Sequence, residues 1–181
     1  MKILFDIDNV LTPTVLSWLP FFIKDHGVKV RYEDFNAPML NLPWFDEGVP
    51  LNHLISWLVT EGLKLKPQGL VLIPDLSEKH ILKTFTDREA TMARITRLWL
   101  QIGYGEAFSG HFDTKIEGKT KAEICKKEKP DLVIDDFPEN VIPIAKLGIP
   151  VLMPDCPWNQ HVKTGNGITR ISGLAEVKKY I

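Results

Sequence analysis

The stretch that decides the fold is Lys2–Val10, which reads KILFDIDNV. Its apolar run, Ile3–Phe5, is typical of a strand buried on both faces of a parallel sheet. The run leads directly into two carboxylates, Asp6 and Asp8, in what we expect to be a loop. Open α/β sheets place their chemistry at the carboxyl ends of parallel strands. Because unpaired buried carboxylates are costly, the pattern predicts a hard cation such as Mg²⁺ beside them, with a solvated turn or a helix cap as the alternative.

Length, composition and charge limit the possible classes of function. The 181 residues suffice for one sizeable core, and 44% hydrophobic with 25% charged residues is an ordinary globular composition. A net charge of −1 indicates neither a nucleic-acid polymer nor a membrane as partner. Cys125 and Cys156 form no Cys-x-x-Cys motif, so we expect packed free thiols in a reducing cytoplasm. We expect no signal peptide, membrane span or zinc site, and the oligomeric state is not predicted.

A mainly helical segment follows the first strand. Apolar side chains recur at helical spacing in two runs between residues 14 and 66. We therefore predict a small helical cap over residues 14–66, inserted into a core domain formed by residues 1–13 and 67–181. The alternative is a crossover helix followed by a long packed loop. Four aromatic residues of this segment could stack on a substrate base, although core packing is the more common role at such spacing: Trp18, Phe22, Trp44 and Phe45.

Strands and helices alternate through the rest of the chain. The apolar runs predict strands at 69–73, 81–85, 132–134, 149–153 and 168–171, with helices between most of them. Three capping residues are expected to start helices: Thr12, Thr86 (with Glu89 completing a capping box) and Ser172. The alternation predicts an α/β fold, a three-layer Rossmann-like parallel sheet with helices on both faces.

Three predicted strands end in polar residues of the kinds that one reaction needs. One is followed by Asp6 and Asp8, a second by Thr86, and a third by Asp135 and Asp136. Because the carboxyl ends of parallel strands lie at one edge of the sheet, these residues should converge. Four carboxylates would repel one another unless a divalent cation and a lysine shared their site.

Two lysines could supply that positive charge. Lys121 fits the start of a predicted helix better than Lys119, so we favour Lys121 and keep Lys119 as the alternative. Gly118-Lys119-Thr120 also resembles the end of a phosphate-binding P-loop. The earlier glycine of that motif falls on Asp113, so we reject a P-loop nucleotidase or kinase.

Together these motifs resemble those of the haloacid dehalogenase superfamily of phosphotransferases, over nearly the whole chain. Four segments match the superfamily's motifs in order: Phe5–Leu11, Thr86–Arg88, Lys121 and Ile134–Asp136. Within the superfamily, Asp135–Asn140 and Pro157–Asn159 are similar to the branch of the 5′-nucleotidases and cytosolic deoxyribonucleotidases.

The resemblance implies a Mg²⁺-dependent phosphatase with Asp6 as the nucleophile and an aspartyl-phosphate intermediate. It implies that Asp6, the backbone carbonyl of Asp8 and Asp136 hold Mg²⁺, with Asp135 as the alternative to Asp136. Asp8 would protonate the leaving alkoxide and later take a proton from the attacking water.

The resemblance also implies how the phosphoryl group is bound. The Thr86 hydroxyl and the Lys121 ammonium would bind its oxygens, supported by backbone N–H groups near Ile7 and Asp87. Asp135 would orient Lys121 or a water on the metal.

The implied substrate is a small phosphomonoester, with a (deoxy)nucleoside monophosphate as the first candidate. The alternatives are a phosphatase or phosphotransferase for a sugar phosphate or a phosphoprotein, and a catalytically weak phosphate-binding regulatory module. The implied location is the cytoplasm. Arg88, His111 and Trp158 are expected to be surface, loop and packing residues rather than site residues.

Overall fold

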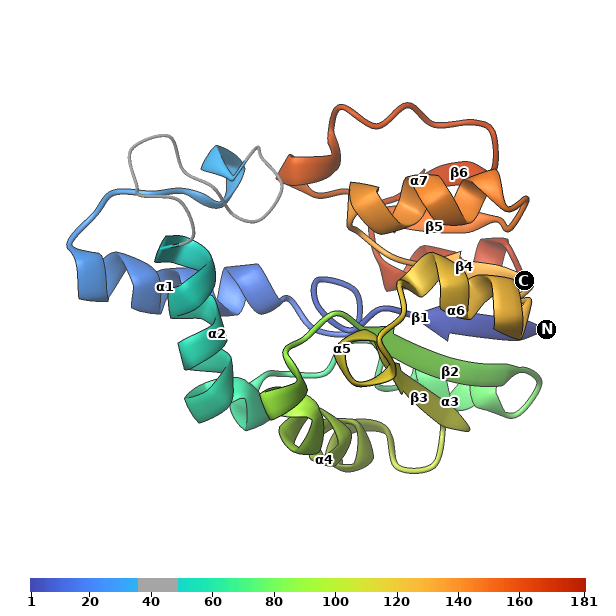
Figure 1. The fold of residues 1–181 in the computed structure, drawn as a ribbon, viewed down its shortest axis with the longest axis horizontal. Helices are drawn as coiled ribbons and strands as arrows, with labels where there is room; N and C mark the ends of the chain where they lie inside the picture. Colours follow the sequence, from blue (N-terminus) through green and yellow to red (C-terminus); the bar gives the residue numbers. More distant parts are fainter. Residues whose placement is uncertain (36–48) are drawn as a thin grey trace.

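The computed structural model describes residues 1–35 and 49–181. Its strands form one six-stranded, all-parallel sheet in the order β3-β2-β1-β4-β5-β6 (Figure 1). The strands are β1 (Lys2–Phe5), β2 (Ile81–Thr86), β3 (Gly110–Asp113), β4 (Leu132–Ile134), β5 (Val151–Pro154) and β6 (Ile168–Ile171). The predicted α/β class and parallel sheet are therefore confirmed.

Helices connect these strands. The α-helices are α1 (Thr14–His26), α2 (Val49–Glu61), α3 (Leu72–Ser77), α4 (Ala93–Tyr104), α5 (Thr114–Glu117), α6 (Lys121–Glu128) and α7 (Pro138–Lys146). Short 3₁₀ helices add η1 (Tyr32–Asp34), η3 (Gly62–Lys64), η4 (Ala90–Met92), η5 (Pro157–Asn159) and η6 (Leu174–Lys179). None of the helices in the described part of the chain has the length and apolarity that crossing a bilayer requires.

Alternate residues of the central strands pack on opposite faces of the sheet, as the two-residue period of a strand requires. Leu4 and Val133 belong to an apolar cluster with residues of α6 and α7. Their neighbours Ile3 and Ile134 belong to a second cluster with residues of α3 and α4. Both faces of the sheet are thus covered, which explains why these strands are continuous apolar runs.

The strand order determines where a site can form. The chain runs from β1 outward through β2 to β3, and then returns to place β4 on the other side of β1. Open α/β sheets bind ligands at the carboxyl ends of the strands that flank such a reversal. The residues that follow Phe5 and Ile134 occupy this position.

The helices α1 and α2 lie together and extend beyond the sheet (Figure 1). The Trp18 indole N–H donates to Nδ1 of His53 at 2.9 Å, which ties α1 to α2. Trp18 and Phe22 are fully buried, so both are core residues, the more common role for their spacing. Trp44 and Phe45 lie outside the described residues. The boundaries of the cap, residues 14–66, stay a prediction.

The prediction of a strand at residues 69–73 is wrong. Its second half belongs instead to the helix α3, and the amide of Ile73 donates to the carbonyl of Gly69. A five-residue apolar run has no periodicity that separates a strand from a buried helical turn. Gly69, at a φ of +67°, turns the chain into this helix, and Pro74 in its first turn needs no hydrogen-bond donor.

The three predicted caps also differ from the structure. Pro13, rather than Thr12, is the cap of α1, and Gly173, rather than Ser172, precedes the 3₁₀ helix η6. The helix expected directly after Thr86 begins at Ala90, as the 3₁₀ helix η4, and continues from Ala93 as α4. A capping box requires the hydroxyl to face the amide three residues on, whereas Thr86 accepts from the amide two residues on.

Candidate active site

Three carboxylates meet beyond the ends of β1 and β4. Asp6 directly follows β1, and its amide donates to the carbonyl of Ile134 at 2.8 Å. Asp135 and Asp136 follow Ile134, the last residue of β4. One carboxylate oxygen from each of Asp6, Asp135 and Asp136 lies within 4.8 Å of the others, and all three residues are buried. The structure thus brings the ends of β1 and β4 together, and Asp87 and Arg88, which follow β2, contact the same site as described below.

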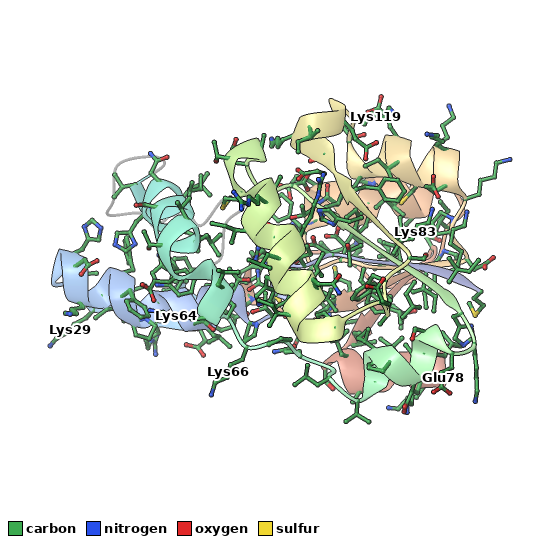
Figure 2. The ribbon with its side chains drawn as sticks, turned by 90° about the horizontal axis from the view of Figure 1, so that it is seen from below. Lys29, Lys64, Lys66, Glu78, Lys83 and Lys119 are labelled. Atoms are coloured by element: carbon green, nitrogen blue, oxygen red, sulfur yellow. The ribbon has the colours of Figure 1, made fainter. Side chains whose placement is uncertain are left out.

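A buried lysine sits among these carboxylates. Lys121 is 1% exposed, and its ammonium lies 2.7 Å from Asp6 Oδ1 and 2.8 Å from Asp135 Oδ2. It occupies the first position of α6, which Thr120 caps by accepting from the amide of Glu123. Lys119, the alternative, is exposed and lies at the edge of the molecule in Figure 2. The geometry therefore places Lys121, and not Lys119, in the cluster.

The electrostatics of the cluster suit a cation. Burial, together with the neighbouring charge of Asp135, raises the pKa of Asp136 to about 7. Burial also raises the pKa of Asp6, although the Lys121 ammonium opposes this. Burial alone would lower the pKa of Lys121, but the carboxylates around it raise that pKa. In their ionised forms, the three carboxylates carry more negative charge than one ammonium balances. Carboxylate oxygens are the donors that Mg²⁺ prefers, so these residues fit the predicted metal.

Asp8 is held by an arginine that the sequence did not suggest as a site residue. Arg88 donates from Nε to Asp8 Oδ2 at 2.8 Å and from Nη2 to Asp8 Oδ1 at 2.7 Å, and Thr14 also donates to Oδ1. Arg88 is 6% exposed, so the prediction that it lies at the surface is wrong. Burial raises the pKa of Asp8, but the Arg88 charge and hydrogen bonds outweigh this and hold the pKa below its usual value.

Asp136 also has a partner that sequence reasoning assigned to packing alone. The Trp158 indole N–H donates to Asp136 Oδ2 at 2.9 Å, and the Asn9 side-chain amide donates to the same oxygen at 3.4 Å. The Asn159 side chain donates to the backbone carbonyl of Asp136 at 2.8 Å. The similarity of Pro157–Asn159 to a nucleotidase segment was the sequence signal that could have identified this contact.

The other predicted site residues lie around this centre. Asp87 accepts from Thr114 at 2.6 Å and from Asn140 at 3.0 Å, and it lies 3.6 Å from the Lys121 ammonium. Thr86 is buried, and its hydroxyl accepts from the amide of Arg88 at 3.2 Å. Ile7 is also buried, and neither it nor Thr86 lines the cavity described next. His111, expected in a loop, lies in β3.

A cavity of 360 Å³ opens onto the cluster. Its lining includes Asp6, Asp136 and Lys121 of the cluster, together with the paired Asp8 and Arg88. Asp135 does not line the cavity; it is fully buried and accepts a hydrogen bond from Lys121. A small molecule in this space could reach Asp6 and Asp8 together, which a nucleophile and a proton-transfer group require.

Solved structures share this fold. A haloacid dehalogenase-like hydrolase from Streptococcus pneumoniae matches with a TM-score of 0.70 and 18% identity, covering 99% of this chain and 97% of that one. A HAD-hydrolase from Bacillus subtilis bound to magnesium matches with a TM-score of 0.64 and 16% identity, covering 99% and 97%. CbbY from Rhodobacter sphaeroides in complex with phosphate matches with a TM-score of 0.58 and 11% identity, covering 97% and 95%.

Sequence comparisons add no further relatives. No protein-family model matches the chain, and no curated protein matches it. At the low identities of the solved structures, the comparison shows the fold, and the chain has the fold of the haloacid dehalogenase-like hydrolases.

Proposed function

We propose that this chain is a Mg²⁺-dependent phosphomonoesterase that uses Asp6 as its nucleophile and forms an aspartyl phosphate. The observation that carries the proposal is the convergence of Asp6, Asp135 and Asp136 around the Lys121 ammonium, beside a cavity. Two solved structures with the same fold support it, since one holds magnesium and another holds phosphate.

In the proposed reaction, a carboxylate oxygen of Asp6 attacks phosphorus while the bond from phosphorus to the leaving oxygen breaks. Water then attacks the aspartyl phosphate and releases inorganic phosphate and free Asp6. Lys121 binds the phosphoryl oxygens as negative charge builds on them. Asp135, which accepts from both Lys121 and the amide of Phe137, holds the ammonium in place for this task.

Mg²⁺ would be held by Asp6, Asp136 and the backbone carbonyl of Asp8, where it would screen the charge between the carboxylate and the phosphate dianion. Asp136 is preferred over Asp135 because Asp136 lines the cavity, whereas Asp135 is fully buried and bonded to Lys121. Trp158 and Asn9 orient the Asp136 carboxylate by donating to its Oδ2.

Asp8 is the proposed proton-transfer group. Its two hydrogen bonds from Arg88 favour the carboxylate, which is the form that accepts a proton from the attacking water. In the preceding step the protonated form would donate to the leaving oxygen. The proposed binding of phosphoryl oxygens by the Thr86 hydroxyl, with backbone N–H groups near Ile7 and Asp87, rests on the motif resemblance.

The similarity of Asp135–Asn140 to the nucleotidase branch makes (deoxy)nucleoside monophosphates one candidate class of substrate. Trp18 and Phe22 are not available to stack on a base, because both are fully buried. Sugar phosphates and phosphopeptides are therefore tested beside nucleotides. The proposed location is the cytoplasm, which agrees with two buried free thiols, Cys125 and Cys156.

The test of this proposal is phosphate release from a panel of small phosphomonoesters, with Mg²⁺ and with a chelator. We expect release that requires Mg²⁺. We also expect Mg²⁺ with beryllium fluoride to raise the Tm, because a ligand that binds only the native state stabilises it. A raised Tm without turnover would indicate the regulatory module instead. If there were no turnover and the Tm did not rise, both the phosphatase and the regulatory module would be contradicted.

A further inference from the structure

The lining of the cavity combines two chemically different surfaces. Asp6, Asp136 and Lys121 form part of it, and apolar side chains of the helix α2 form another part. Besides the aromatic residues Phe137 and Trp158, six apolar side chains line the cavity: Val15, Leu51, Leu54, Ile55, Leu58 and Met92. Four of these come from α2, at the spacing that places residues on one face of a helix. A phosphomonoester bound at Asp6 would therefore direct its leaving group toward an apolar surface.

Several polar side chains of the cavity already have hydrogen-bond partners within the protein. All three nitrogens of Arg88 donate, two to Asp8 and one to Thr96 at 3.2 Å. The Asn140 side-chain amide donates to Asp87. Both side chains therefore help to position the acidic groups Asp8 and Asp87.

The Asn9 side chain also has hydrogen-bond partners within the protein. Its amide donates to Asp136, while its side-chain oxygen accepts from the amide of Val15 at 3.1 Å. The remaining charged residues of the lining, Glu89 and Lys115, are exposed to solvent. The residues of α2 that line the cavity are Leu51, Leu54, Ile55 and Leu58, so hydroxyl groups packed against them would lose water without gaining a partner on this helix, which is costly.

We propose that the substrate is a phosphomonoester of an apolar alcohol, whose hydrocarbon part packs against Leu51 and Ile55 of α2. Both side chains are partly exposed, so a ligand can bury surface on them. Burial of hydrocarbon gives affinity, and the unpaired hydroxyls of a sugar would oppose it. This inference rests on the proposed phosphatase function and names the substrate class of the same site.

The test is the kcat/KM for n-alkyl phosphates from ethyl to hexyl, measured by phosphate release with Mg²⁺. The leaving alcohols have nearly constant reactivity, so the dependence on chain length reports contact with the apolar lining. We expect kcat/KM to rise about fourfold for each added methylene that is buried. Glucose 6-phosphate and nucleoside 5′-monophosphates should be poorer substrates than hexyl phosphate by at least about tenfold.

Two variants on one helix test whether α2 is the surface in contact. Ile55→Ser should flatten the rise with chain length, so that the hexyl-to-ethyl ratio of kcat/KM falls. Val59→Ser is the matched control, because Val59 is another β-branched residue of α2 that is 45% exposed and does not line the cavity. Its hexyl-to-ethyl ratio should equal that of the wild type.

The outcomes separate this inference from the function on which it rests. No phosphate release from any ester would contradict the phosphatase itself. Release that requires Asp6 but is independent of chain length, or that favours sugar phosphates or nucleotides, would overturn the apolar leaving group and leave the phosphatase standing. An unchanged hexyl-to-ethyl ratio in Ile55→Ser would likewise exclude α2 as the binding wall.

Discussion

Replacing Asp6 by asparagine is expected to abolish phosphate release, with a loss of at least about 1000-fold in kcat. An amide of the same shape has no carboxylate oxygen to attack phosphorus, so the step that forms the aspartyl phosphate cannot occur. The fold should survive, because asparagine keeps an acceptor for Lys121 and removes one of several crowded negative charges. Released phosphate and thermal unfolding measure the two effects.

A matched control uses an aspartate that follows another strand. Asp155 lies directly after β5 and accepts from Arg170 at 2.8 Å, outside the acidic cluster. Asp155→Asn should keep its activity within about twofold, since surface ion pairs contribute little. Full activity in Asp6→Asn would refute the nucleophile assignment, and equal losses in both variants would attribute the effect to folding.

Replacing Lys121 by methionine is expected to lower the free energy of unfolding by about 3–5 kcal/mol and to remove activity. Methionine is of similar length but uncharged, so Asp6 and Asp135 would lose the cation that lies within 2.8 Å of both. Uncompensated buried carboxylates destabilise the native state strongly. Urea unfolding at neutral pH without divalent cations measures the change.

Lys119→Met is the control for this variant, since it removes the same charge two residues away. Lys119 is exposed and 3.9 Å from Glu117, so its replacement should change stability by less than about 0.5 kcal/mol. If both variants were equally stable and equally active, the charge at Lys121 would have no special role. If Lys119→Met alone lost activity, the choice between the two lysines would be reversed.

The strand ends could be predicted from the sequence because their signals are local. Ile3–Phe5 and Leu132–Ile134 are continuous apolar runs followed at once by aspartates, and a parallel sheet brings such ends to one edge. The choice of Lys121 over Lys119 was also local, because it rested on the start of a helix. The resemblance of these segments to known motifs pointed to the same arrangement.

The partners of the acidic residues could not be predicted in the same way. Arg88 lies 80 residues from Asp8, and nothing in its neighbouring sequence distinguishes it from a surface arginine. Trp158 lies in η5 after β5, and its contact with Asp136 depends on the pairing of β5 with β4. The error at Gly69–Ile73 has another cause, since a short apolar run fits a strand and a buried helical turn equally well.

The most direct test of the central claim is covalent trapping of the phosphoryl group. A protein carrying Asp8→Asn, in which hydrolysis of the intermediate should be slowed, is mixed with an aryl phosphate and Mg²⁺ and quenched in acid. The acyl phosphate is then reduced with borohydride and mapped by peptide mass spectrometry. We predict modification at Asp6. Turnover with no modified carboxylate, or with modification at any residue other than Asp6, would contradict the account.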